Sequence, residues 1–131
     1  MREIKVSDVT EIVARLFEHS CHYLPEDVLT ALKKAREEEE SPVCRDVYGR
    51  MLEDAEIAGK EQIPLCQDTG VAIVFLELGQ EVHITGGDLY TAVNKGVSQG
   101  YINGYLRKSV VRQPILTRGL CYLIGGETHP G

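Results

Sequence analysis

The sequence predicts an α+β fold with an N-terminal helical layer, a small and mainly antiparallel β element, and a long glycine-striped helix. Three observations predict it. Apolar residues recur at helical spacing up to residue 58, and a short run rich in β-branched residues follows at 71–78. Glycine then recurs at every fourth position, as Gly96, Gly100 and Gly104. A chain of 131 residues is long enough to bury the core of one ordinary domain.

Three helices are expected before the β element. Apolar residues recur at helical spacing from Val6, and the first helix is expected to have Ser7 or Asp8 as its N-cap. Pro25 is expected in the first turn of the second helix, because the N–H that proline lacks has no partner there. The third helix is expected to begin with Ser41 as N-cap and Pro42 as its first residue. We expect it to close before Gly59.

Two strands are expected next. The segment from Val71 to Leu78 is short, apolar and rich in β-branched residues, which favours a buried strand over a helix. Residues 82–85 form the second predicted strand, and the short connection at 79–81 suggests that the two pair as a hairpin. His83 alternates with apolar neighbours, so we expect it on the outer face of its strand and not as a ligand.

The last predicted element is the glycine-striped helix. Two glycines followed by Asp88 indicate a break and an N-cap, and the helix is expected to run to about Val111. It would carry Arg107 near its end. Each of its three spaced glycines costs about 1 kcal/mol relative to alanine in a helix interior. Close packing of the backbone against another helix or a strand is favoured over the approach of a ligand.

The loop before the first strand is the best candidate for chemistry. Pro64 opposes a helix here, while Asp68 and Gly70 are turn formers. Cys66 and Gln67 therefore lie in a tight loop at the mouth of a rigid strand, where functional residues concentrate. A lone cysteine is more often a buried, inert side chain. A nearby carboxylate would raise the thiol's pKa, whereas a bound metal would deprotonate it.

Charge is distributed unevenly along the chain. The formal net charge of −6 argues against a general nucleic-acid surface. Residues 1–88 carry 9 basic and 19 acidic side chains, whereas residues 89–126 carry five basic side chains and no acidic one. Two interpretations stay open: a solvated, basic helix end, or a local attractor for a small anion. An arginine such as Arg107 would suit a carboxylate better than a lysine would.

The cysteines and the hydropathy indicate the compartment. Four cysteines at irregular spacing are typical of a reducing, cytoplasmic setting and not of a disulfide framework. Neither a signal peptide nor an apolar run of membrane-spanning length is visible. His19, Cys21 and His22 could bind zinc, but histidines that help to end a helix are the favoured interpretation. Cys21, Cys44 and Cys121 are expected to be structural.

Four short motifs resemble the N-terminal part of the iron–sulfur hydro-lyases, which comprise the class I fumarate hydratases and the α-subunits of two-subunit fumarases and tartrate dehydratases. The resemblance covers about residues 5–112. It rests on Pro64-Leu65-Cys66-Gln67-Asp68-Thr69-Gly70, Thr85-Gly86-Gly87-Asp88, Gly100-Tyr101, and Gly104-Tyr105-Leu106-Arg107-Lys108-Ser109. It implies that residues 1–112 are the N-terminal portion of the α-domain and that residues 113–131 are a divergent tail, truncated or altered.

The resemblance also implies roles for four residues. Cys66 would be one of three cysteine ligands to a 4Fe-4S cluster. Gln67 and Arg107 would bind the substrate, with Arg107 holding one of its carboxylates. Asp68 would be catalytic, in the proton-transfer or orienting shell. This chain supplies only one of the three expected ligands, so the resemblance implies that the chain alone is inactive.

The implied activity is the reversible hydration and dehydration of a small dicarboxylic acid. The implied partners are the substrate, a β-subunit or C-terminal domain of the same enzyme, and further copies in a homo-oligomer. No nucleic acid or membrane partner is expected, and the expected location is cytoplasmic. Fumarate or malate, tartrate, and a methylated relative all remain open as substrates. The alternative function is a non-catalytic subunit fragment that acts in assembly through the glycine-striped helix, and a redox-sensing thiol domain is a weaker one.

Overall fold

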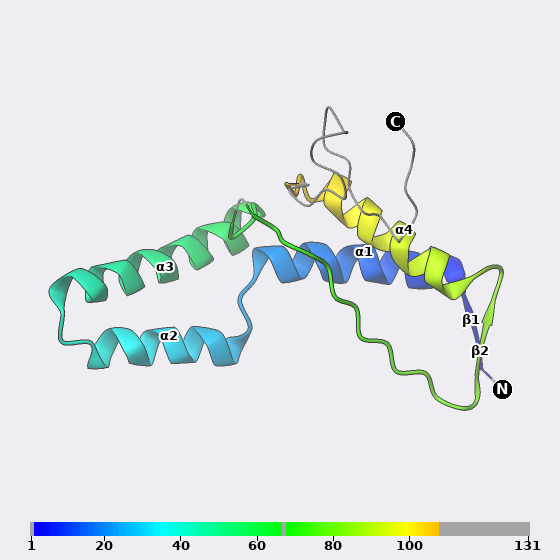
Figure 1. Ribbon diagram of the computed structural model, residues 1–131, viewed down its shortest axis with the longest axis horizontal. Helices are drawn as coiled ribbons and strands as arrows, with labels where there is room; N and C mark the ends of the chain where they lie inside the picture. The colour runs from blue at the N-terminus through cyan, green and yellow to red at the C-terminus, as the bar shows by residue number, and fades with distance from the viewer. Residues whose placement is uncertain (1, 67, 108–131) are drawn as a thin grey trace, which may run out of the picture. The chain divides into compact units, whose positions relative to one another are not determined.

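The computed structural model describes residues 2–66 and 68–107 (Figure 1). Its elements, in chain order, are β1 (Arg2–Lys5), α1 (Val6–His22), α2 (Glu26–Glu38), α3 (Pro42–Glu61), β2 (Val82–Thr85) and α4 (Leu89–Asn103). The described residues are mostly helical with one small sheet, which confirms the predicted α+β class. None of the helices in these ranges is both long and apolar enough to cross a membrane.

The described residues divide into two compact units. The first unit combines the chain up to Glu18 with the chain from residue 68 onward, and the second unit covers His19–Cys66. Helix α1 begins at Val6, so Ser7 and Asp8 lie inside it and the predicted N-cap at one of them is wrong. Its residues up to Glu18 belong to the first unit and His19–His22 to the second.

The sheet of the first unit differs from the predicted one. Strands β1 and β2 lie side by side (Figure 1). They pair in parallel, with Glu3 opposite His83. The predicted antiparallel hairpin is therefore wrong, and the segment 71–78 forms no strand among the described residues. The true partner of β2 lies about 80 residues away in sequence, and a parallel pair needs such a long crossover. His83 is exposed, which confirms its place on the outer face.

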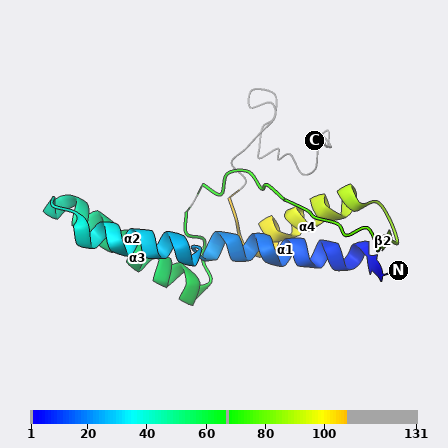
Figure 2. The ribbon, with the colours of Figure 1, turned by 90° about the horizontal axis from the view of Figure 1, so that it is seen from below.

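Helix α4 lies alongside α1 (Figure 2). Its glycines Gly96 and Gly100 pack against the backbone of α1. A Cβ atom built on Gly96 would lie 2.6 Å from the carbonyl oxygen of Thr10 and 2.8 Å from Cβ of Val13. A Cβ atom on Gly100 would lie 2.9 Å from Cδ1 of Phe17. These contacts confirm close packing against another helix. They also occupy the glycine face, which removes the feature on which the assembly alternative depended.

Polar and aromatic contacts add to this packing. The hydroxyl of Thr10, a buried residue, lies 3.0 Å from the carbonyl oxygens of both Val6 and Ala92, and its single proton can be shared between them. The rings of Phe17 and Tyr101 lie 4.8 Å apart between centroids. The pair is tilted, in the range where aromatic rings attract one another. Helices α1 and α4 are therefore held by contacts along their shared length.

The start of α4 is as predicted, and its end is not. Asp88 is the N-cap, and its Oδ1 accepts a hydrogen bond of 2.8 Å from the backbone N–H of Thr91. That backbone bond, with a second from the Thr91 hydroxyl, lowers the pKa of the Asp88 carboxyl. The helix ends at Asn103 and not near residue 111. Gly104 caps it and Tyr105 takes a left-handed φ of 52°, which turns the chain out of the helical path.

The second unit contains the helical hairpin of α2 and α3. Ser41 is the N-cap of α3 and Pro42 its first residue, which confirms the predicted start. Pro25 stands at the N-cap of α2 and not inside its first turn. Helix α3 runs past Gly59 to Glu61, so its predicted end is wrong. A Cβ on Gly59 would lie 2.9 Å from the ring of Tyr23, so this glycine permits close packing and does not end the helix.

Candidate functional site

The predicted turn at Asp68–Gly70 is present in the first unit. The backbone N–H of Gly70 donates to Oδ1 of Asp68 over 3.4 Å, a long contact of the kind that aspartate makes in turns. Gly70 takes a left-handed φ of 65°, and no described atom would meet a Cβ placed there. The left-handed backbone conformation, and not a lack of room for a side chain, therefore explains why glycine stands at position 70.

Two hydrogen bonds fasten this turn to the chain at the end of α4. The hydroxyl of Thr69 donates to the backbone carbonyl of Arg107 over 2.5 Å. The hydroxyl of Tyr101, on the last turn of α4, donates to the carbonyl of Gly70 over 2.9 Å. As a result, the backbone beside Asp68 and the backbone of Arg107 are neighbours, although 38 positions separate Thr69 from Arg107 in the sequence.

Sequence reasoning missed Thr69 and Tyr101 as positioning residues. Both lie inside motifs that carry the resemblance, and this was the available signal. Their hydroxyls act across the fold, so local patterns could not reveal their partners.

Arg107 lies beyond the helix that was expected to carry it. It follows the helix cap by three residues, and its side chain is exposed. The preceding residue, Leu106, is only 4% exposed, and its N–H donates to the carbonyl of Tyr101 over 3.0 Å. The backbone is therefore fixed immediately before Arg107, while the guanidinium remains accessible to an anion.

Cys66 belongs to the second unit. Its side chain is exposed, and the preceding residue, Leu65, donates its N–H to the carbonyl of Cys21 over 2.9 Å. The loop that carries Cys66 is thus joined to the end of α1. Gln67, the remaining predicted site residue, lies outside the described residues, as do Cys121 and the tail at 113–131.

The other described cysteines differ from Cys66 in their surroundings. Cys21 is partly buried, and burial raises the pKa of its thiol, which disfavours the thiolate that metals bind. Cys44 is exposed on α3, so burial does not explain it. Near Cys21, the ring of His19 stacks on Tyr23 with centroids 4.5 Å apart. His22 is buried, and its Nε2 has no hydrogen-bond partner among the described residues.

These donors fit one ligand of a metal cluster and not a complete set. Cys66 offers an exposed thiol on an anchored loop. Within residues 2–66 and 68–107, no group of three or more histidine, cysteine, aspartate or glutamate side chains is placed to hold a metal ion. A four-iron cluster could therefore take one thiolate from the described part of this chain and would need its other ligands from elsewhere.

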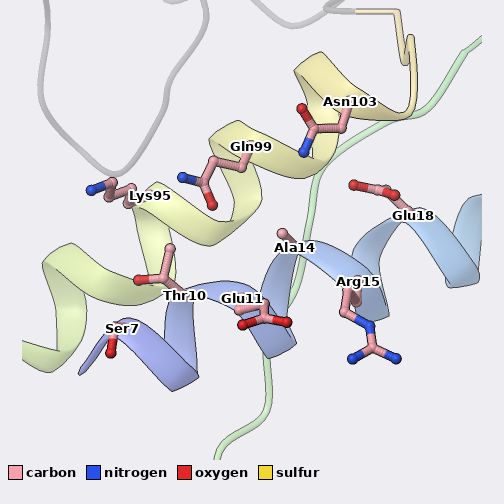
Figure 3. A pocket seen from close by; sticks show the side chains of 9 residues that line it. All are labelled: Ser7, Thr10, Glu11, Ala14, Arg15, Glu18, Lys95, Gln99 and Asn103. Carbon is pink, nitrogen blue, oxygen red and sulfur yellow. The ribbon is translucent and has the colours of Figure 1, made fainter. Parts of the chain in front are cut away.

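A groove between α1 and α4 is separate from the candidate residues. It has a volume of about 460 Å³ (Figure 3). Its lining residues are Ser7, Thr10, Glu11, Ala14, Arg15, Glu18, Lys95, Gln99 and Asn103. The lining contains two basic and two acidic side chains, so the electrostatic potential in the groove is not dominated by charge of one sign. Lys95, one of the five basic residues within 89–126, thus faces a groove that carboxylates also line. Arg107 does not line this groove.

Comparison with known proteins supplies the family. The model of the family described as fumarate hydratase (Fumerase) matches residues 10–119. The putative L(+)-tartrate dehydratase subunit alpha of Methanocaldococcus jannaschii is 38% identical over 109 residues, which make up 82% of this chain and 37% of that protein. The L(+)-tartrate dehydratase subunit alpha of Escherichia coli O157:H7 is 29% identical over 106 residues, or 81% of this chain and 35% of that protein. The chain spans little more than a third of the length of these curated relatives.

Proposed function

Because this chain belongs to the fumarate hydratase family, we propose that it is the N-terminal part of an iron–sulfur hydro-lyase acting on a small dicarboxylic acid. The complete enzyme would add water to the double bond of its substrate and remove it again. The observation that carries this proposal is the fastening of the Asp68–Gly70 turn to Arg107 through the hydroxyl of Thr69. That bond keeps the segment of Asp68, the proposed proton-transfer group, beside the segment of Arg107, the proposed carboxylate-binding group, so that both could reach one substrate.

Each proposed residue has a role that suits its chemistry. The exposed guanidinium of Arg107 would hold one substrate carboxylate through two parallel hydrogen bonds. Asp68 would hold or move a proton beside the reacting carbon, and Gln67 would orient the substrate. Cys66 would supply one thiolate to a 4Fe-4S cluster. When bound, that cluster would supply Lewis acidity toward the substrate's oxygen atoms.

The rest of the site would come from other polypeptide. The relatives are named as alpha subunits, which supports a β-subunit as partner. The remaining cluster ligands and acid–base groups would lie in that subunit or in the part of the relatives' length that this chain does not span. We also propose a homo-oligomer and a cytoplasmic location, in keeping with the irregular spacing of the cysteines.

The proposal is tested by anaerobic reconstitution with iron and sulfide. The 131-residue chain alone should bind no stoichiometric cluster and should hydrate nothing, because one thiolate cannot replace three. The assembly completed with the missing parts of the Methanocaldococcus jannaschii relative and its β-subunit should contain iron and acid-labile sulfide. It should dehydrate tartrate or interconvert malate and fumarate. An assembled complex with neither cluster nor turnover would overturn the proposal, and turnover by the chain alone would overturn the assigned division of the site.

Replacing Arg107 by lysine in the complete enzyme tests the carboxylate contact. The charge survives but the two-pronged donor is lost, so we expect kcat/KM to fall by about ten- to hundredfold. Arg50→Lys is the matched control, since Arg50 is an exposed arginine whose partner, Asp46, lies on the same surface helix. Its kinetics should match those of the unmodified enzyme. Unchanged kinetics for Arg107→Lys would leave Arg107 with a backbone role only.

A further inference from the structure

The segment 71–78 is held at both ends and, between them, makes no backbone pairing with residues 2–66 or with the rest of 68–107. Before it, the carbonyl of Gly70 accepts the hydroxyl of Tyr101 over 2.9 Å. After it, the N–H of Val82 donates to the carbonyl of Gly79 over 3.0 Å, and β2 begins. No backbone hydrogen bond joins residues 71–78 to any other described residue. Figure 1 shows the segment as a bare trace that leads to β2.

The side chains of this segment are exposed to an unusual extent. Six large apolar residues fall within eight positions, with these exposed fractions: Val71 68%, Ile73 75%, Val74 42%, Phe75 93%, Leu76 50% and Leu78 48%. Single exposed apolar residues are normal on a protein surface, but a contiguous apolar stretch marks an interaction site. Both odd and even positions are exposed, so neither face of the segment is covered by the described residues.

The composition and the free backbone indicate what would cover it. β-branched and aromatic residues are the ones that suit a pleated surface, and unpaired N–H and C=O groups accept an added strand. A polypeptide that runs alongside the segment would satisfy its backbone, and the partner's apolar side chains would cover those of the segment. A small ligand would leave most of this length exposed, and a basic or acidic partner would find almost no charge to pair with, since Glu77 is the one charged residue here.

The lengths of the relatives support one polypeptide as this partner. The family match at 10–119 includes the whole segment, and the curated relatives are nearly three times as long as the part that matches. We propose that residues 71–78 are the docking surface for the remaining part of an α-subunit-type chain, which lies along them as an extended apolar segment. This inference rests on the proposed function. Because the segment begins directly after Gly70, docking there would also fix the Asp68–Gly70 turn from its second side.

Co-expression tests the docking directly. The 131-residue chain is produced together with a tagged polypeptide that comprises the residues of the Methanocaldococcus jannaschii relative beyond the matched region. The two should co-purify, and Phe75→Asp should reduce the recovered complex by about tenfold or more, as expected for a buried aromatic anchor. Tyr90→Asp is the matched control. Tyr90 is an aromatic residue 65% exposed in the first turn of α4, where a carboxylate is tolerated, so it should leave the complex intact.

Amide hydrogen exchange supplies the second measurement. In the chain alone, the amides of residues 71–78 should exchange fast, because they have no described backbone partner. In the complex they should exchange at least about tenfold more slowly. Failure of the unmodified pair to co-purify, a complex indifferent to Phe75→Asp, or unchanged exchange would each overturn the docking surface. Slow exchange in the chain alone that vanishes on dilution would also overturn it, by identifying a second copy as the occupant.

The outcomes also separate this inference from the proposed function. A complex that depends on Phe75 but neither binds iron nor hydrates a dicarboxylate would leave the docking surface standing and overturn the hydro-lyase proposal. Turnover by a complex whose 71–78 amides stay unprotected from exchange would support the hydro-lyase proposal and overturn the docking surface.

Discussion

Cys66→Ser in the completed enzyme should remove the iron–sulfur cluster and lower hydro-lyase activity by at least about a hundredfold. Residues that only support a metal ligand change affinity or activity by about ten- to hundredfold, so a lost ligand should cost more. A serine hydroxyl does not replace a thiolate, which is the softer ligand and the one that iron–sulfur clusters use. Iron and acid-labile sulfide per chain, measured without oxygen, report the loss independently of turnover.

The other cysteines provide the control for this prediction. Cys44 is exposed, as Cys66 is, but it lies on α3, and Cys21 is partly buried at the end of α1. Cys44→Ser and Cys21→Ser should keep the cluster content of the unmodified enzyme. Normal cluster content in Cys66→Ser would remove Cys66 from the ligand set. Loss in Cys44→Ser alone would move that role to α3.

Gly96→Ala should lower the free energy of unfolding of the first unit by about 1–2 kcal/mol, although alanine favours helices. The intrinsic gain from glycine to alanine is about 1 kcal/mol in a helix interior. Here the new Cβ would lie 2.6 Å from a carbonyl oxygen of α1, at Thr10, and backbone cannot move aside as a side-chain tip can. Overpacking of this kind costs about 1–3 kcal/mol. A contact with immobile backbone should cost an amount near the upper end of that range, which exceeds the gain in helix propensity.

Gly49→Ala is the matched control for Gly96→Ala. Gly49 lies inside α3, and the three atoms nearest to its added Cβ would all belong to the end of the Arg36 side chain, at an ordinary 3.5 Å. The helix-propensity gain should therefore survive, and the second unit should become more stable by about 0.5–1 kcal/mol. Urea unfolding followed by residue-level hydrogen exchange measures the two units separately. Stabilisation by Gly96→Ala would show that α4 does not rest on α1 as closely as the structure places it.

Several features were predictable because they depend on residues close together in the chain. Ser41 with Pro42, and Asp88 with Thr91, start α3 and α4 through contacts within one helical turn. The turn at Asp68–Gly70 follows from the turn propensity of its own residues. The glycine spacing predicted a close helix contact because it places Gly96 and Gly100 on one face, although it could not identify α1 as the neighbour.

The sequence by itself therefore determined the helices, the capped starts of α3 and α4, the candidate loop and the family. Only the tertiary structure decided which distant segments meet: Glu3 with His83 in a parallel pair, and Thr69 with the backbone of Arg107. It also gave residues 71–78 no backbone partner among the residues that it describes, although their composition is that of a strand. The physical reason is that caps and turns are stabilised by neighbouring residues, whereas strand pairing and cross-fold hydrogen bonds require a partner that local propensity does not specify.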